Sequence, residues 1–144
     1  MYLTGTYDRN LDAKGRLSLP PAFRKELPEK VRVIAAPEGE VDAVYVFTED
    51  TFKDWLAQVF EKKGGYDPTN AQHRVVKEAL NGAATTLEID SAARISLPES
   101  DRKEAHLDRE VTIVGNDDRL VIWDRAAYAE RKTASKAVVA NFFN

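Results

Sequence analysis

Two cationic side chains, Lys14 and Arg16, flank a glycine in the stretch Asp12-Ala13-Lys14-Gly15-Arg16. Gly15 can supply the positive φ that a tight turn needs, and leucines precede and follow the stretch, so the sequence predicts two strands joined by a hairpin turn. A guanidinium can bind a phosphate or the edge of a guanine with two hydrogen bonds. The turn is therefore a candidate site for binding nucleic acid.

A structural role competes with DNA contact for Arg16, because Asp12 lies in the same turn and can pair with it. The same spacing recurs at Asp90 and Arg94, and for Arg94 this favours the structural pair. Both readings stay open for Arg16, whereas Lys14 has no evident partner and favours DNA. Three more cations nearby are candidate phosphate contacts or plain solvated surface: Arg9, Arg24 and Lys25.

The turn belongs to an internal repeat. Residues 90–104 repeat residues 12–26, with eight of the fifteen aligned positions identical. Such a repeat sets the number of structural units, which here is two. The second copy has Ala92 and Ala93 where the first has Lys14 and Gly15, so it lacks both the cation and the glycine. We therefore expect the second turn to differ in shape.

Composition and charge limit the class of protein and the kind of partner that the sequence allows. The 144 residues suffice for one domain or for two halves that share a core. The sequence has no cysteine, no signal pattern and no apolar run of membrane-spanning length, so we expect a soluble protein of the reducing cytoplasm. The net charge is −3, yet residues 9–25 carry a local charge of +4 and residues 87–103 one of −1. This distribution favours the first repeat as the one that meets a polyanion.

Each repeat is predicted to contain a strand, the hairpin turn, a second strand, a short helix and two further strands. The fold class is accordingly mainly β with α, with the repeats at residues 5–50 and 82–125. Residues 51–81 form a helical connector, since apolar residues recur with helical spacing at Phe52, Trp55, Leu56, Val59 and Phe60. A second connector helix is expected to start at Asp67-Pro68.

The last segment, residues 126–144, is expected to be a helix and tail, with the helix beginning near Arg125. It ends in large apolar residues, and two interpretations remain open for them. They either contact another subunit or fold back onto their own protomer. These residues are Val138, Val139, Phe142 and Phe143.

The doubled motif Asp-x-x-Gly-Arg-x-x-Leu-Pro, together with the helical connector, resembles the MraZ family of the AbrB-like swapped-hairpin group. The resemblance covers nearly the whole chain. It implies a double-split β-barrel built from the two repeats, and a cytoplasmic, nucleoid-associated regulator of the division and cell-wall gene cluster. It also implies binding to short direct repeats in promoter DNA as a ring-shaped homo-oligomer. Taken together, the candidate DNA-binding residues are Lys14, Gly15, Arg16, Arg9, Arg24, Lys25 and Arg94.

No residue pattern indicates an enzyme. His73 and His106 have no neighbours at metal-ligand spacing, and there is no glycine-rich phosphate loop. We therefore expect no catalytic residue, metal, cofactor, membrane or small-molecule substrate. Two alternatives to a DNA-binding regulator remain. One is an oligomeric protein that acts on protein partners without binding DNA, and the other is a barrel enzyme, which would need a buried polar cluster between the repeats.

Overall fold

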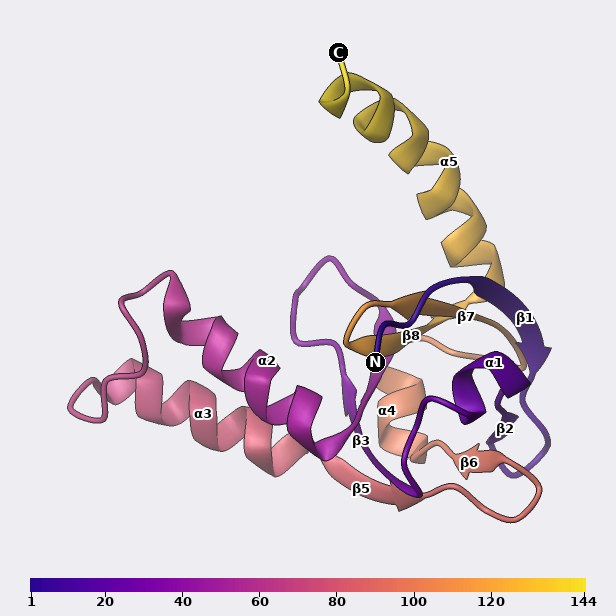
Figure 1. Cartoon of the computed structure of the whole chain (residues 1–144), viewed down its shortest axis with the longest axis horizontal. Helices are drawn as coiled ribbons and strands as arrows, with labels where there is room; N and C mark the ends of the chain where they lie inside the picture. Colours follow the sequence, from indigo (N-terminus) through magenta and orange to yellow (C-terminus); the bar gives the residue numbers. More distant parts are fainter.

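The strands of the two repeats interleave in a mixed α/β fold (Figure 1), which the computed structural model describes over residues 1–144. The first repeat contributes β1 (Thr6–Asn10), β2 (Arg16–Ser18), β3 (Lys30–Ala35) and β4 (Ala43–Phe47). The second contributes β5 (Thr85–Glu88), β6 (Arg94–Ser96), β7 (Glu110–Asn116) and β8 (Arg119–Asp124). The helices are α1 (Pro21–Arg24), α2 (Glu49–Glu61), α3 (Ala71–Ala83), α4 (Glu99–Glu104) and α5 (Arg125–Phe142).

Pairing between strands crosses from one repeat to the other. Six strands form one antiparallel sheet in the order β1-β7-β8-β4-β3-β5, and β2 pairs with β6 in a separate two-stranded sheet. The predicted turn between β1 and β2 is present, but the predicted pairing of these two strands is wrong. Strand β1 pairs instead with β7 of the second repeat. The expected double-split barrel is present only in part, since the strands interleave but β1 and β5 remain sheet edges and no closed barrel forms.

Alternation along the strands divides the core into two layers. Val33 and Val46 point to a cluster of 18 buried residues that also includes Leu17 and Ile95 from the two-stranded sheet. Their neighbours in sequence point to the other face of the large sheet, where a second cluster of ten lies against α2 and α3. The connector aromatics expected in the core are buried there: Phe52, Trp55 and Phe60.

The connector forms two helices, and its second helix starts later than expected. Asp67 does not cap it; instead its carboxylate accepts hydrogen bonds from the N–H and the hydroxyl of Thr69 in the preceding turn. The N-cap is Asn70, whose side chain accepts from the N–H of His73. His73 is buried, and its Nδ1 accepts from the N–H of Asp67, which is a structural role.

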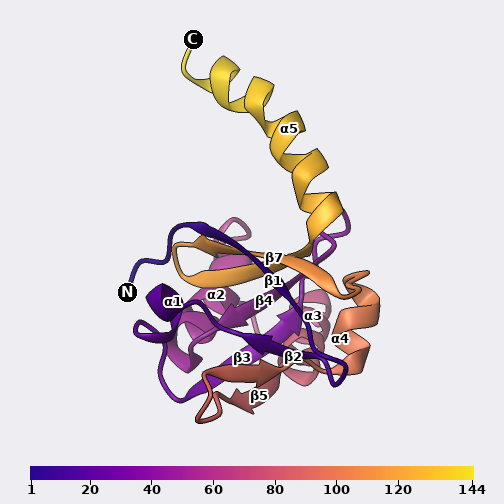
Figure 2. The same ribbon diagram turned by 90° about the vertical axis from the view of Figure 1, so that its right-hand side faces the viewer.

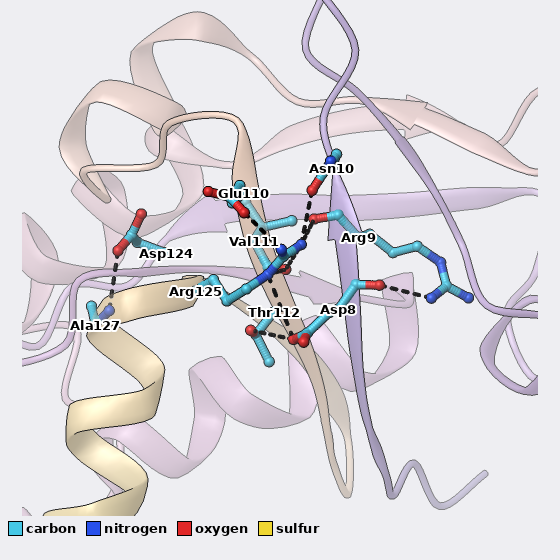
Figure 3. Close-up of polar contacts among 9 residues, drawn as sticks. All are labelled: Asp8, Arg9, Asn10, Glu110, Val111, Thr112, Asp124, Arg125 and Ala127. Atoms are coloured by element: carbon cyan, nitrogen blue, oxygen red, sulfur yellow. Dashed lines mark hydrogen bonds and ion pairs between the residues drawn. The ribbon is translucent and has the colours of Figure 1, made fainter.

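Helix α5 begins at Arg125, as expected, and projects away from the rest of the protein (Figures 1 and 2). Arg125 fixes its base by donating hydrogen bonds to the Glu110 carboxylate, the Arg9 carbonyl and the Asn10 side chain, at 2.7–2.9 Å (Figure 3). Every residue from Ala129 onward is exposed, including Phe142 at 84%. The tail therefore does not fold back onto its own protomer. None of the helices is both long and apolar enough to cross a membrane.

Candidate nucleic-acid interface

The two turns have the same backbone conformation. The Asp12 carboxylate accepts hydrogen bonds from the N–H groups of Lys14 and Arg16, both at 2.9 Å. In the second turn the Asp90 carboxylate accepts from the N–H groups at positions 92 and 94 at the same distances. Each turn is closed by a further backbone bond, from the third residue after the aspartate to the aspartate carbonyl, at 3.0 Å.

The expectation that the second turn differs in shape is therefore wrong. Ala93 has a φ of 61°, in the same region as the 76° of Gly15. An alanine in this conformation costs about 1–2 kcal/mol, and the hydrogen bonds to the Asp90 carboxylate hold it there. Gly15 therefore does not determine the backbone conformation of the first turn. That conformation depends on the aspartate that both turns contain.

Both turns also contain the arginine–aspartate ion pair considered from the sequence. The Nε of Arg16 donates to the Asp12 carboxylate, and the Nε of Arg94 donates to the Asp90 carboxylate at 3.0 Å. The backbone N–H groups of the same arginines are the largest cause of a lowered pKa for Asp12 and for Asp90, so both carboxylates are ionised at neutral pH. The terminal nitrogens of the two arginines make no hydrogen bond within the chain, and they stay available to a ligand.

Strands β2 and β6 form a short ribbon that places both arginines on one face. Arg16 lies opposite Ser96 and Ser18 lies opposite Arg94, so these four side chains share a face of the ribbon. Leu17 and Ile95 occupy the other face and are buried in the core. The two arginines are diagonal neighbours, a relation that separates side chains by about 7–8 Å.

Sequence reasoning missed Ser18 and Ser96 as members of this face. Both are exposed, and neither hydroxyl has a hydrogen-bond partner within the chain. The available signal was that serine occurs at the same position in both repeats, in alternation with buried leucine or isoleucine. The outer face of the ribbon thus offers two guanidinium groups and two hydroxyl groups.

Strand exchange redistributes the charge that the sequence places in the first repeat. The N–H of Leu97 donates to the carbonyl of Gly15 at 3.0 Å, and α4 follows from this end of the ribbon. At the other end the N–H of Leu19 donates to the carbonyl of Ala93 at 2.9 Å, and α1 follows. Arg24 and Lys25 therefore belong to the end that carries the second turn. The imbalance of +4 and −1 exists along the sequence but not between the two ends of the ribbon.

The remaining predicted residues lie apart from the outer face. Arg9 is on β1 of the large sheet, where its guanidinium donates to the Asp8 carbonyl at 2.8 Å (Figure 3). The same guanidinium lies 5.6 Å from the centre of the Tyr7 ring. Arg24 donates to the Leu27 carbonyl at 3.1 Å. The structure thus brings together Lys14, Gly15, Arg16 and Arg94 on the ribbon and its turns, while Arg9, Arg24 and Lys25 stand outside it.

The fold and this site define a two-repeat protein whose halves exchange strands and present a basic ribbon. A family model described as "MraZ protein, putative antitoxin-like" matches residues 2–72 and 80–141. The chain belongs to the MraZ family, as its doubled motif suggested. Relatives named transcriptional regulator MraZ include those of Kocuria rhizophila, 36% identical over 88% of this chain and 83% of the relative, and Treponema denticola, 32% identical over 88% and 84%. That of Mesoplasma florum is 33% identical over 89% and 84%.

Proposed function

We propose that this protein is a transcription regulator that binds double-stranded promoter DNA with the β2–β6 ribbon. The observation that carries the proposal is the outer face of that ribbon, where Arg16 and Arg94 lie diagonally with unpaired terminal nitrogens. The major groove of B-DNA admits a two-stranded ribbon, and arginine is the commonest reader of guanine there. The names of the relatives support a regulator, which is not an enzyme class.

Different residues take different parts in this proposal. Arg16 and Arg94 read base edges, each oriented by the aspartate of its own turn. Lys14 is exposed at the tip of the first turn and contacts phosphate, whereas Gly15 is buried in the same turn and acts only through its neighbours. Arg9, Arg24 and Lys25 supply weaker phosphate contacts. Binding is local, because the net charge of −3 gives the whole molecule no general attraction to DNA.

Assembly into a homo-oligomeric ring is a second part of the proposal, together with a relation of the interleaved but open two-repeat fold to the AbrB-like group. A single ribbon contacts few phosphates, and several copies raise the effective concentration of each next contact. Exposed apolar residues at the end of α5 support subunit contact, since Val138, Val139, Phe142 and Phe143 are more than half exposed. The operator is then a set of short direct repeats, and the proposed target is the division and cell-wall gene cluster in the cytoplasmic nucleoid.

The experiment that tests this function varies the phase of two operator repeats. Affinity for the upstream DNA of the chain's own gene is measured by gel shift at two salt concentrations. The spacing between two repeats is then changed by half a helical turn and by a full turn, about 10 base pairs. We expect affinity to fall with the half turn and to recover with the full turn. If affinity did not depend on the helical phase of the two repeats, the proposal that the ring recognises the operator would be wrong.

The alternative is an oligomeric protein that acts only on protein partners. It is supported by the same exposed apolar end of α5, because an exposed apolar surface can bind a protein partner in the absence of DNA. The gel-shift titration distinguishes the two functions, because this alternative expects binding to DNA that is absent or insensitive to salt.

A further inference from the structure

Arg102 of the second repeat lies against the turn of the first repeat. A Cβ added to Gly15 would stand 2.7 Å from both the Cζ and the Nε of Arg102, so the guanidinium occupies the space that a side chain at position 15 would need. The Nε of Arg102 donates to the carbonyl of Leu97 at 3.1 Å, which holds the guanidinium in place. Leu97 is itself hydrogen-bonded to the carbonyl of Gly15.

The equivalent residues at the other end of the ribbon do not repeat this arrangement. Arg24 aligns with Arg102, and Ala93 aligns with Gly15. Ala93 carries the Cβ that Gly15 lacks, and Arg24 donates instead to the carbonyl of Leu27. Because the two turns have the same backbone, the glycine of the first turn is not needed for the turn itself. What it provides is room for Arg102.

The guanidinium of Arg102 faces an open cleft of about 510 Å³ beside the first turn. Arg109 also lines this cleft, together with two carboxylates, Asp12 and Asp108. Asp12 is already paired with Arg16. A third carboxylate, Glu99, pairs with Lys103 at 3.1 Å, and its pKa is lowered first by that pairing and further by the nearby charge of Arg102. The terminal nitrogens of Arg102 have no hydrogen-bond partner within the chain.

We propose that Arg102 is a phosphate-contacting residue of the first turn, donated by the second repeat, and that Gly15 serves to make room for it. This inference rests on the proposed function, and it names a contact that the doubled motif does not contain. An arginine held by one hydrogen bond at Nε keeps its two terminal nitrogens for bidentate contact with a phosphate. The duplex backbone beside Lys14 and Arg16 would bring a phosphate into the cleft.

The test compares four variants with the wild-type protein by fluorescence anisotropy on a labelled duplex of the chain's own upstream DNA, over a series of salt concentrations. Arg102→Gln should lower affinity about three- to tenfold near 0.1 M salt and reduce the salt slope by about 0.9, the value for one phosphate contact. Gly15→Ala should do the same, because it displaces the guanidinium while the turn tolerates alanine, as Ala93 shows. The double variant should lose no more than either single one.

Lys103→Gln is the matched control, since it removes the same charge from the same helix at a residue paired with Glu99. It should stay within twofold of wild type, and melting curves check that every variant is folded. The proposal is overturned if Arg102→Gln keeps the wild-type affinity and slope, or if the losses of Gly15→Ala and Arg102→Gln multiply. In that case a loss of affinity for the duplex in Arg16→Ala would show that the proposed function still holds. Absence of salt-dependent binding by the wild type would overturn both.

Discussion

The Asp12–Arg16 and Asp90–Arg94 turns share a backbone and differ in what surrounds it. In both, an aspartate carboxylate accepts two backbone hydrogen bonds and pairs with the arginine four residues on. The residues between them differ, with lysine and glycine in one turn and two alanines in the other. The comparison separates the shape of the turn, which both copies keep, from the chemistry at its tip, which has diverged.

The same divergence reaches the core, and there it should have the largest effect. Phe23 is 1% exposed and packs edge-on against Tyr7, whereas the aligned Asp101 is buried with an Oδ2 that has no hydrogen-bond partner. Burial raises the pKa of Asp101 because the charged form is poorly solvated there. We expect Phe23→Ala to lower the free energy of unfolding by about 3–5 kcal/mol and Asp101→Leu to raise it by about 1 kcal/mol.

Urea denaturation of both variants measures this difference. Phe23→Leu is the control for the first site, since it keeps an apolar side chain and should cost less than Phe23→Ala. A substantial loss of stability in Asp101→Leu would show that the carboxylate has a favourable interaction in the fold. Helices α1 and α4, which carry Phe23 and Asp101, would then contribute more equally to the stability of the core than the burial of these two residues indicates.

A smaller effect should separate the turns when valine replaces the residue at positive φ. Gly15→Val introduces a strained branched side chain and displaces Arg102, for an expected cost of about 3 kcal/mol. Ala93→Val adds branching to a residue that already has a Cβ, so we expect about 1–2 kcal/mol. The free energies of unfolding measure both costs. If the two variants lost the same free energy of unfolding, the contact of Arg102 with the first turn would not be what distinguishes the two turns.

Much of the fold could be predicted from the sequence because the signals are local. The spacing of Phe52, Trp55 and Phe60 places them on one buried helix face, and the helix expected near Arg125 begins there. The repeat itself indicates two equivalent units. These features depend on neighbours along the chain, which a single sequence contains.

The pairing of β1 with β7 could not be predicted in the same way. A turn sequence determines where the chain reverses, but the partner of each strand depends on contacts between residues far apart in sequence. The charge comparison failed for the same reason, since strand exchange places α1 at the end of the ribbon that carries Ala93. Ala93 itself shows that hydrogen bonds to an aspartate can outweigh the conformational preference of a residue.

The smallest expected effect concerns the cation at the tip. Lys14 is exposed, and only its backbone N–H takes part in the turn, so Lys14→Ala should leave the melting temperature unchanged. We expect its affinity for promoter DNA to fall about three- to fivefold near 0.1 M salt, with a salt slope smaller by about 0.9. Anisotropy titrations at several salt concentrations measure both quantities.

Ala92→Lys is the reciprocal change, because it places the same cation at the equivalent position of a turn with the same backbone. If both ends of the ribbon approach the duplex, as the shared face of Arg16 and Arg94 requires, this variant should bind about threefold more tightly, with a correspondingly steeper salt dependence. An unchanged affinity would mean that the second turn stays away from the phosphates. The arginine of that turn would then serve only its ion pair with Asp90, and recognition would belong to the first turn and to Arg102 beside it.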